Sequence, residues 1–580
     1  MADRKQDILD MLRELSELTM LDEGDPQSFR VRAYESATHA ISALGSDPGA
    51  LSAKELQKIE GIGKSTAEKI RELIDSGKVA KLEGLRAKHP PAVVALLKIP
   101  GLGPKALSRL RTELGVGSLE DLRAVLASRK LRDLKGFGPR SEENLTRAIA
   151  RIDAQGDAGR TPISVAHPLG QRLCERLREV PGVVAVEVCG SLRRFSETIG
   201  DVDIVVAAEN AAPVMETLVA MPVVDRILGQ GESKTSFLTH RGTQVDVRVV
   251  APAQLGAALL YFTGSKGHNI KLRMRALARG MTLNEYALSD VESGKIVAQT
   301  TETEIYAALD LPFIPPVLRE DAGEIEAAEA GTLPAPIGKI VGDFHLHTTV
   351  SNDAQSSLEE MVNAAIARGI RVFAITDHAE GTRAGVGREA LLIQREKIRA
   401  LQAKVGDAIT LLHGVELNIG ADGSLDYDAE FRASFDWCLA SVHDHFELDR
   451  NAQTARIIKA MMDPSVRMIG HLSARMIGAR PPIDLDLDTI FEAAELTGCA
   501  LEVNGALPRL DLSVEALRRA RGRKVTFVLT SDAHITGELA RVDFAVSNAA
   551  RAWITPERIA NAWAPEKLLA WVRAGRQPAA

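Results

Sequence analysis

The run GSLRRFSETIGDVD (190–203) constrains the possible fold more than any other stretch of the chain. Asp201 and Asp203 stand two residues apart in an apolar, β-branched run, so a strand there places both carboxylates on one face. The alternating run QVDVRVV (244–250) predicts a further strand, which would bring Asp246 beside them. Three such carboxylates would hold two divalent cations about 3.5–4 Å apart, an arrangement suited to phosphoryl transfer.

The turn between VEVCG and these aspartates suits a triphosphate. Its glycines and Ser191 predict a tight turn whose backbone N–H groups cradle phosphate, while Arg193 and Arg194 neutralise charge. A lone Asp-x-Asp is usually a solvated strand end. Here the turn, the third aspartate and the later run YFTGSKGHN (261–269) fit one site together, which favours the functional interpretation.

Residues 1 to about 318 resemble the family X DNA polymerases, the group that includes polymerase beta. The matching runs are GSLRRFSETIGDVD, VDVRV, YFTGS and RALARGMTLNEY. The resemblance implies that Asp201, Asp203 and Asp246 are catalytic and hold Mg²⁺ or Mn²⁺, with Asp246 accepting the proton of the primer 3′-hydroxyl. It implies these nucleotide-binding residues: Gly190, Ser191, Arg194 and Gly200 on the triphosphate, Tyr261, Phe262 and Gly264 beside the sugar, and Asn269 and Arg273 nearer the base.

Two positions depart from the polymerase beta pattern. Gln244 stands where that enzyme has an arginine two residues before the third aspartate, which bears on how the primer end is positioned. Lys266 replaces an aspartate near the nucleotide base and bears on nucleotide affinity. Neither change touches the metal ligands.

At 580 residues the chain is too long for a single core and should hold three to five domains. No stretch approaches 18 continuous apolar residues, and the start, MADRKQDILD, does not read as a signal peptide. The four cysteines lie far apart, without a C-x-x-C pair, so neither a zinc finger nor a disulfide framework is expected. We therefore expect a cytoplasmic monomer with no membrane contact.

The net charge of −7 would disfavour nucleic acid if it were evenly spread, but residues 84–151 hold 14 Lys and Arg against 6 Asp and Glu, a local +8. Three helix–Gly-x-Gly–helix turns, at 58–77, 97–110 and 134–149, resemble helix-hairpin-helix modules. Such modules bind the DNA backbone rather than the bases. The expected DNA-binding residues are Gly61, Gly63, Lys64, Gly101, Gly103, Lys105, Gly136, Gly138 and Arg140. Gapped or nicked DNA and dNTPs are the expected partners.

Lys69 is the candidate nucleophile of the first helices. An amine can form a Schiff base with the aldehyde of an abasic sugar if cationic neighbours such as Lys64 and Lys81 lower its pKa. On spacing alone, a lysine on a solvated helix face is the more common case. The resemblance aligns Lys69 with the lyase lysine of polymerase beta, whereas the second lysine of that enzyme's pair is Ser65 here.

Beyond Lys339 the chain alternates β-branched runs with helical stretches, which predicts a βαβ series. Eight of the 13 histidines lie in this half, and six of seven runs carry a His or an acidic residue at or near the carboxyl end of the strand. In a closed barrel that end is the face where active sites form. Imidazoles and carboxylates there would suit zinc, manganese or iron. His413 and His445 are interpreted as structural.

Residues 339–575 resemble the PHP (polymerase and histidinol phosphatase) domain through the motifs HLH, TDH, GVE, SVH, IGH and SDAH. The resemblance implies a metal cluster of Mn²⁺, Zn²⁺ or Fe, with Glu416 bridging, and implies these ligands: His345, His347, His378, Glu416, His443, His471, Asp532 and His534. A ninth ligand is ambiguous because Asn352 occupies the family's aspartate position and Asp353 follows it. We prefer Asp353, since a neutral amide replaces a carboxylate poorly beside a dication. The amidohydrolase barrel, which also begins with H-x-H, would normally need a bridging lysine, and no suitably placed strand-end lysine appears.

The expected fold is multidomain, α+β and α/β. The expected segments are a helical lyase-like domain (1–83), a helix-hairpin-helix fingers-type domain (84–155), a nucleotidyltransferase palm (156–256), a thumb (257–318), a linker (319–338) and a distorted (β/α)7 PHP barrel (339–580).

The leading hypothesis is a gap-filling DNA polymerase of base excision repair. The PHP resemblance adds a metal-dependent 3′–5′ exonuclease that can also cut at abasic sites or act on 3′-phosphates. The polymerase beta resemblance adds a 5′-deoxyribose-phosphate lyase at Lys69. The alternative is mainly a PHP nuclease whose polymerase half holds DNA ends. A non-enzymatic DNA-end scaffold is the third reading, disfavoured because both sets of ligands are retained.

Overall fold

The chain forms two compact units, Met1–Arg160 and Thr161–Ala580. A computed structural model describes residues 4–23, 28–43, 48–96, 99, 102–134, 137–138, 141–142, 145–146, 149, 160–382 and 384–574. Among the helices in these ranges, none has both the length and the apolar character needed to cross a bilayer.

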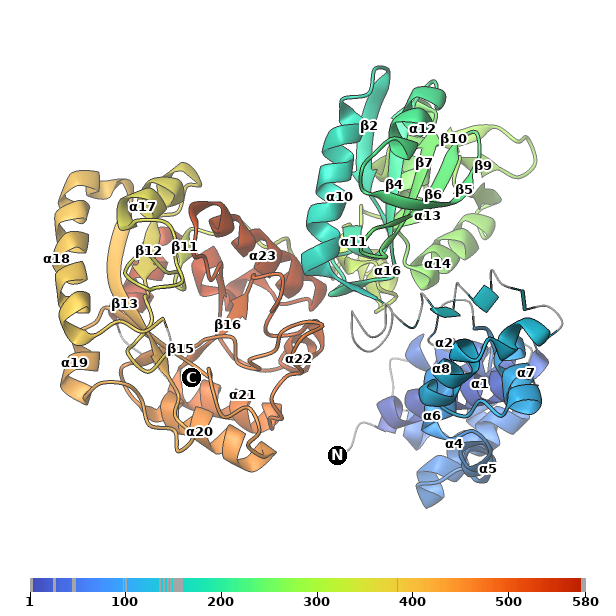
Figure 1. Cartoon of the computed structure of the whole chain (residues 1–580), viewed down its shortest axis with the longest axis horizontal. Coiled ribbons are helices and arrows are strands. Elements are labelled where there is room, and N and C mark those ends of the chain that lie inside the picture. The colour runs from blue at the N-terminus through green and yellow to red at the C-terminus, as the bar shows by residue number, and fades with distance from the viewer. Residues whose placement is uncertain are drawn as a thin grey trace. The chain divides into compact units, whose positions relative to one another are not determined.

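The first unit is helical in its described part (Figure 1). Its helices are α1 (Arg4–Glu23), α2 (Phe29–Ala43), α3 (Ala53–Leu56), α4 (Lys64–Ser76), α5 (Ala80–Lys88), α6 (Pro91–Leu96), α7 (Pro104–Leu114) and α8 (Leu119–Ala127). The spacing of Ile8, Leu12 and Leu15 gives α1 one apolar face, and all three side chains are fully buried. Helix α1 is therefore the axis against which α2, α5 and α7 pack.

Two of the expected helix-hairpin-helix turns lie largely within the described residues. In the first, Gly61 has φ +93°, and an added Cβ would lie 3.1 Å from the carbonyl oxygen of Ser36, so glycine is required there. Gly63 and Gly103 are the N-cap residues of α4 and α7. Gly101, Gly136 and Arg140 lie outside the described residues.

The second unit begins with a five-stranded sheet in the order β2-β4-β7-β6-β5 (Figure 1). The elements of this part are β1 (Thr161–Pro162), α10 (Ile163–Arg178), β2 (Val183–Val188), α11 (Gly190–Arg193), β3 (Thr198–Ile199), β4 (Asp201–Ala208), α12 (Ala212–Val219), β5 (Val224–Gln230), β6 (Lys234–Thr239) and β7 (Gln244–Val250). Strands β4 and β7 are parallel neighbours, while the other pairs of this sheet are antiparallel. The strands expected over 201–208 and 244–250 are therefore adjacent.

A smaller helical part with three short strands follows the sheet. It comprises α13 (Leu255–Thr263), α14 (Lys266–Leu277), β8 (Met281–Leu283), β9 (Leu288–Asp290), β10 (Ile296–Ala298), α15 (Glu302–Ala308) and α16 (Glu324–Glu329). Helix α16 belongs to the segment expected as a linker, yet its Ile325 and Ala328 are buried in the same core as Leu260 and Tyr306. At least this portion of the segment packs on the preceding part rather than spanning open solvent.

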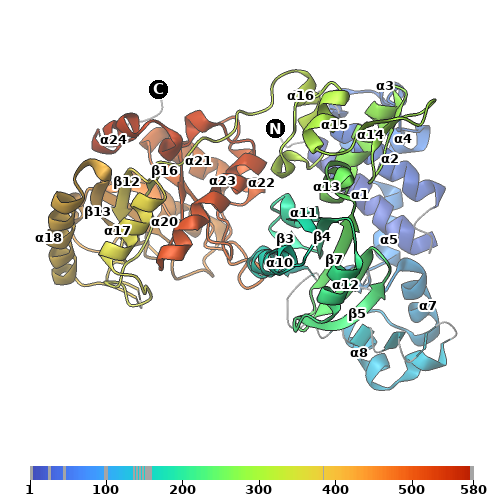
Figure 2. The same cartoon turned by 90° about the horizontal axis from the view of Figure 1, so that it is seen from above.

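Seven parallel strands, in sequence order β11 to β17, form a nearly closed barrel in the last part of the chain (Figure 2). They are β11 (Gly342–Asp343), β12 (Val372–Ile375), β13 (Thr410–Asn418), β14 (Trp437–Ser441), β15 (Val466–Ile469), β16 (Ala500–Asn504) and β17 (Phe527–Thr530). A parallel bridge between Leu346 and Ala533 joins the segments that follow the first and last strands. The expected seven-stranded barrel is confirmed.

Helices that connect these strands or follow the last of them lie outside the barrel, as α18 shows in Figure 2. They are α17 (Leu358–Ala367), α18 (Arg388–Val405), α19 (Ala429–Ala433), α20 (Arg450–Met462), α21 (Leu487–Thr497), α22 (Val514–Arg519), α23 (Val542–Arg551) and α24 (Pro565–Arg573). Phe344, Trp437 and Met468 are fully buried among the strands. This packed core supports the residues that follow the carboxyl ends of the strands.

Gly256→Ala should lower the free energy of unfolding of the second unit by about 1–3 kcal/mol, because overpacking forces the backbone apart. An added Cβ at Gly256 would lie 2.3 Å from the carbonyl carbon of Thr301. Urea unfolding monitored by circular dichroism measures the change. Gly84→Ala, in α5 with no atom within 4 Å, is the matched helical control and should stabilise its own unit by up to about 1 kcal/mol. Equal stability of Gly256→Ala and wild type would contradict the expected clash.

Candidate active sites

The three aspartates expected to hold metal converge on the palm sheet. Asp201 and Asp203 come from β4 and Asp246 from β7, and Asp203 and Asp246 are direct partners in the parallel register. One oxygen from each of the three carboxylates lies within 4.8 Å of the others. The parallel pairing of two alternating strands thus produces the cluster.

The electrostatics of this cluster fit divalent cations. Burial, followed by the negative charges of Asp201 and Asp246, raises the pKa of Asp203 to about 7. Oδ1 of Asp246 is buried without a hydrogen-bond partner, and Oδ2 accepts a hydrogen bond of 3.3 Å from Nε2 of Gln244. Three crowded oxygen donors with an unsatisfied buried atom are the ligand set that Mg²⁺ or Mn²⁺ would complete.

The turn before β4 is shaped around Asp203. Gly190 has φ +60°, and an added Cβ would lie 2.2 Å from Oδ2 of Asp203, so only glycine fits. Gly190 and Ser191 open the short helix α11, and the backbone N–H of Ser196 donates to the carbonyl of Ser191. Gly200 directly precedes β4. The structure therefore places these three expected nucleotide-binding residues beside the carboxylates.

Of the remaining expected nucleotide-binding residues, Arg194 follows α11 and the others lie at the end of α13 or on α14. Nη1 of Arg194 donates to the carbonyl of Thr263 over 2.5 Å, which brings this arginine to the segment containing Tyr261, Phe262 and Gly264. Nδ2 of Asn269 donates to the carbonyl of Tyr261 over 2.7 Å. The guanidinium of Arg273 lies 5.3 Å from the centre of the Tyr261 ring.

A buried ionic network behind this turn was not expected from the sequence. Glu302 forms ion pairs with Arg193 at 2.7 Å and with Arg319 at 2.6 Å. Although burial acts in the opposite direction, the two guanidiniums lower the pKa of Glu302. The three residues are more than 100 positions apart at their extremes, and no local pattern marks them as partners. The network ties the triphosphate turn to the part that follows the palm sheet.

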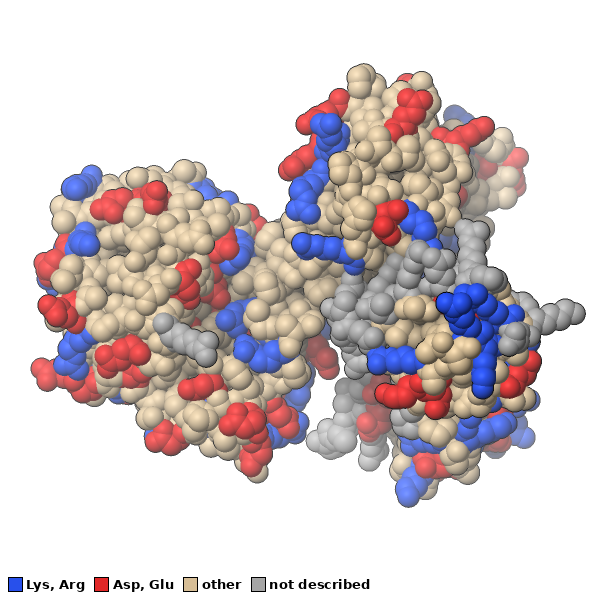
Figure 3. Space-filling model, in the orientation of Figure 1, with Lys and Arg blue, Asp and Glu red and all other residues tan. Residues whose placement is uncertain are grey.

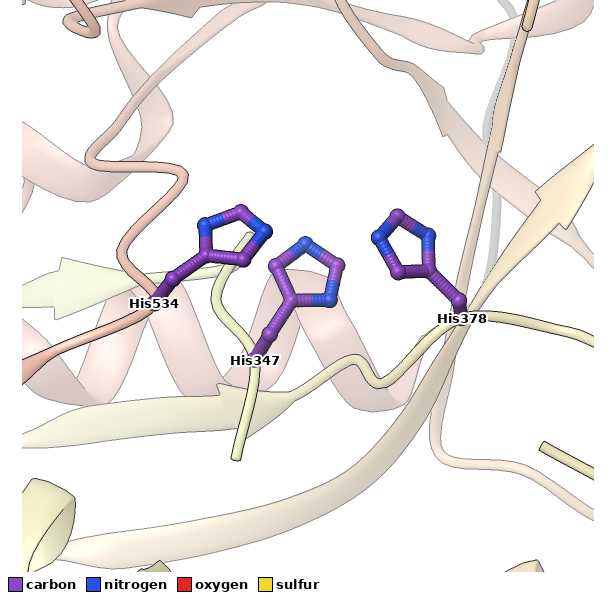
Figure 4. Close-up of side chains that lie close together, drawn as sticks. All are labelled: His347, His378 and His534. Carbon is purple, nitrogen blue, oxygen red and sulfur yellow. The ribbon is translucent and has the colours of Figure 1, made fainter. Parts of the chain in front are cut away.

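The eight expected barrel ligands follow or end successive strands and lie close together. They form four groups of potential metal ligands: His347, His378 and His534; His345, His471 and Asp532; His345, His347 and Glu416; and His378, Glu416 and His443. Figure 4 shows the ring of His347 between those of His378 and His534. The centre of the His347 ring lies 4.1 Å and 4.3 Å from the centres of these two rings.

Glu416 is the centre of this cluster. Its carboxylate lies 2.8–3.6 Å from a ring nitrogen of each of five histidines, which are His345, His347, His378, His443 and His471. Although burial opposes it, the charges of His345, His443 and His378 lower the pKa of Glu416 well below its ordinary value. A carboxylate surrounded in this way fits the expected bridging position.

Several potential metal-ligating atoms of the cluster are buried and make no hydrogen bond. Both ring nitrogens of His347 and Oε2 of Glu416 have no hydrogen-bond partner. Burial, with His378 and His534 acting in the same direction, lowers the pKa of His347 to about 3, so this imidazole is neutral. A neutral imidazole and a carboxylate with open lone pairs are the types of group that can bind a metal ion, and a hydrogen-bonded core rarely leaves such atoms unsatisfied.

Asp353 lies with this cluster. Its Oδ2 is 3.3 Å from Nε2 of His378 and 3.5 Å from Nε2 of His534. Asn352 and Asp353 are both exposed, so these contacts, not burial, favour Asp353. His413 and His445 lie outside the four groups, as expected for structural residues. Nδ1 of His413 instead accepts a hydrogen bond from Arg395.

Two further residues at the barrel site were not selected from the sequence. Oε1 of Glu502 contacts Nδ1 of His345 at 2.5 Å and orients that ring, the usual role of an outer-shell carboxylate. Nε of Arg509 lies 3.4 Å from Oδ2 of Asp532. The βαβ series expected beyond Lys339 predicted strands in this half, but nothing in the sequence paired Glu502 with His345.

In the helical unit, Lys69 lies in a partly buried setting. Its Nζ donates to Oγ of Ser65 over 2.7 Å and lies 6.0 Å from the centre of the Tyr34 ring. Burial lowers the pKa of Lys69. The charges of Glu68 and Glu72 oppose this shift, while those of Lys81 and Arg30 act in the same direction as burial. Of the expected cationic neighbours, the structure thus supports Lys81.

The described part of this unit also has a basic surface. Figure 3 shows Lys and Arg side chains gathered near α7 and α8. The exposed basic residues of this region are Lys105, Arg123, Arg129, Lys130 and Arg132. Such a surface, beside helix N-termini with free N–H groups, suits a phosphate backbone.

Comparison with family models assigns most of the chain. The DNA polymerase beta thumb model matches residues 258–320, and the PHP domain model matches 343–506. A helix-hairpin-helix domain matches residues 3–79, and a SAM-like helix-hairpin-helix tandem matches 93–151.

Curated relatives extend these matches. The chain is 36% identical over 563 residues to the DNA polymerase/3′-5′ exonuclease PolX of Bacillus subtilis, covering 96% of this chain and 97% of that one. It is 27% identical to DNA polymerase lambda of Rattus norvegicus, over 50% of this chain and 52% of the relative. A probable phosphatase of Acetivibrio thermocellus is 30% identical, over 35% of this chain and 84% of the relative. Because the first likeness spans both chains almost completely, this chain belongs to the family X DNA polymerases that carry a carboxy-terminal PHP domain.

Proposed function

We propose that the chain fills short gaps in DNA by nucleotidyl transfer at the palm aspartates and removes 3′-terminal nucleotides at the barrel cluster. One observation carries the proposal: the unit Thr161–Ala580 contains two separate sets of converging, partly unsatisfied metal ligands. The name of the Bacillus subtilis relative supports both activities, and that of the rat relative supports the polymerase activity.

At the palm, Asp201, Asp203 and Asp246 would hold Mg²⁺ or Mn²⁺, which stabilises the charge that develops on the attacking and leaving oxygens. Asp246 accepts the proton of the primer 3′-hydroxyl, and its unsatisfied Oδ1 leaves it able to do so. Gln244 holds the other oxygen of Asp246 in place. This arrangement supports in-line attack with a pre-positioned base.

The triphosphate lies on the turn beside Asp203. Ser191 and Gly200 offer hydrogen-bond donors, and the guanidinium of Arg194 neutralises phosphate charge. The end of α13, with Tyr261, Phe262 and Gly264, lines the sugar. Asn269 donates to the backbone of this segment at Tyr261, and the guanidinium of Arg273 lies over the Tyr261 ring. These contacts support the proposed position of both residues nearer the base.

At the barrel, the eight histidine and carboxylate ligands with Asp353 would hold Mn²⁺, Zn²⁺ or Fe. Such a cluster neutralises a phosphodiester and activates water. Glu416 joins the groups, and Glu502 fixes the orientation of His345. A 3′-terminal phosphodiester is the proposed substrate, with abasic sites and 3′-phosphates as further ones. The similarity to probable phosphatases supports phosphoester hydrolysis.

The helical unit grips gapped or nicked DNA through its backbone, in a salt-sensitive and sequence-independent way. The exposed basic residues near α7 and α8 and the helix N-termini after Gly63 and Gly103 support this role. Lys69 serves as the Schiff-base nucleophile of a 5′-deoxyribose-phosphate lyase, supported by its lowered pKa. The protein acts as a monomer in the cytoplasm, which suits its four free, buried cysteines.

Asp203→Ala should reduce extension of a labelled primer in gapped DNA by at least about 100-fold and leave 3′ degradation within twofold of wild type. His345→Ala should do the reverse, because each variant disrupts one ligand set. Both are measured on denaturing gels with dNTPs and Mg²⁺ or Mn²⁺. Loss of both activities in either variant would contradict two independent sites. If Asp203→Ala extends normally, the alternative stands: a nuclease whose polymerase half only holds DNA ends.

Asp353→Ala should lower the number of metal ions bound by the purified protein, because its carboxylate lies beside His378 and His534. Inductively coupled plasma mass spectrometry after removal of loose metal gives the count. Asn352→Ala is the matched control and should bind as much metal as wild type. An unchanged count in Asp353→Ala, with a loss in Asn352→Ala, would assign the position to the amide instead.

Lys69→Arg should abolish borohydride trapping of the protein on DNA with a 5′-abasic end, because a guanidinium keeps the charge but forms no Schiff base. Lys78→Ala, an exposed lysine just beyond α4, is the control and should trap like wild type. Gap filling measured in the same samples tests that Lys69→Arg is folded. Trapping that persists in Lys69→Arg would show that another amine is the nucleophile.

A further inference from the structure

The barrel packs directly on the turn that follows the proposed triphosphate site. The Phe195 ring, directly after Arg194, stacks on the ring of Phe544 of α23, with 5.5 Å between centres and 24° between planes. Phe195 is buried and has φ +61°, an unusual conformation for a large side chain. The backbone of the turn is therefore held in part by a residue of the barrel.

Arg551, the last residue of α23, holds the same turn by hydrogen bonds. Its Nη1 donates to the carbonyl of Phe195 over 2.8 Å, and its Nη2 forms an ion pair with Oε1 of Glu320 at 3.1 Å. The side chain of Arg551 is only 9% exposed. An ion pair so shielded is worth more than a surface pair, because solvent screens it less.

The same oxygen of Glu320 also pairs with the proposed triphosphate ligand. Oε1 lies 3.1 Å from Nε of Arg194, so one carboxylate oxygen is shared by Arg194 and Arg551. Nη1 of Arg194 is anchored on the carbonyl of Thr263. The position and the effective charge of Arg194 therefore depend on how the negative charge of Glu320 is divided between two guanidiniums.

We infer that Arg551 of the barrel is a positioning residue for nucleotide binding, acting through Glu320 on Arg194. The inference rests on the proposed role of Arg194 in holding the triphosphate. While Arg551 takes up part of the Glu320 charge, Arg194 keeps positive charge for the incoming phosphates. Without Arg551, Arg194 is left as the partner of Glu320 within 4 Å among the described residues, and Glu320 competes with the triphosphate for its guanidinium.

The test is steady-state gap filling by the full chain on DNA with a one-nucleotide gap, with KM for the dNTP and kcat measured separately. Arg551→Ala should raise KM for the dNTP about fivefold, equivalent to about 1 kcal/mol, and change kcat less than twofold. Degradation of 3′ ends should stay within twofold of wild type. The double variant Arg551→Ala/Glu320→Gln should return KM to within twofold of wild type, because the competing charge is gone.

A general weakening of the barrel is excluded by a matched control. Arg558 is another partly buried barrel arginine, but its hydrogen bonds run to the backbone at Ala520, Arg521 and Val525 of the barrel itself. Arg558→Ala should leave KM for the dNTP unchanged. An unchanged KM in Arg551→Ala would overturn the inference, and so would a raised KM that Glu320→Gln fails to restore.

Arg194→Ala separates this inference from the proposed function. If Arg194→Ala raises KM and Arg551→Ala does not, triphosphate binding by Arg194 stands and the positioning role of Arg551 falls. If Arg194→Ala leaves KM unchanged, Arg194 does not hold the triphosphate and both ideas fall. If KM for the dNTP rises in both Arg194→Ala and Arg551→Ala, and Glu320→Gln restores it only when combined with Arg551→Ala, both the proposed function and the inference are supported.

Discussion

The structure must hold two clusters of buried ionisable side chains close together, although several of their polar atoms have no hydrogen-bond partner. Asp203 cannot easily ionise beside Asp201 and Asp246, and Glu416 is enclosed by five imidazoles. Burying ionisable groups costs free energy unless they are fully paired or bind a metal ion. This cost arises at two clusters. In each, the side chains lie on or next to strands whose positions are fixed by parallel pairing. Rigid placement of costly groups is what distinguishes a functional cluster from a chance gathering.

Local pattern predicted the framework of both clusters. The two alternating runs around Asp203 and Asp246 became neighbouring strands, and the histidine-bearing runs became successive barrel strands. This succeeds because side-chain alternation and βαβ order are properties of short segments. The resemblance to two families then indicated which polar residues to expect as metal or nucleotide ligands. The relatives and the family models confirm those two families.

Long-range partners could not be predicted in the same way. Glu502 contacts His345 across 157 positions, and Arg551 contacts the carbonyl of Phe195 across 356. No periodicity connects such residues, and an arginine at the end of a helix usually interacts with solvent. The segment 319–338 illustrates the same difficulty. Its acidic, alanine- and proline-rich composition favours a linker. Glu320 and Glu324 instead pair with residues distant in sequence, and Ile325 is buried in a hydrophobic core.

The junction between the first and last strands of the barrel has a consequence for its folding. The first and last strands do not pair along their length, and one short bridge, Leu346 to Ala533, links the segments that follow them. Those two segments also carry His345 and His347 on one side and Asp532 and His534 on the other. Ions bound by residues of both segments would add to the backbone hydrogen bonds that His347 and Asp532 make across this junction, and metal binding would then stabilise the closed barrel.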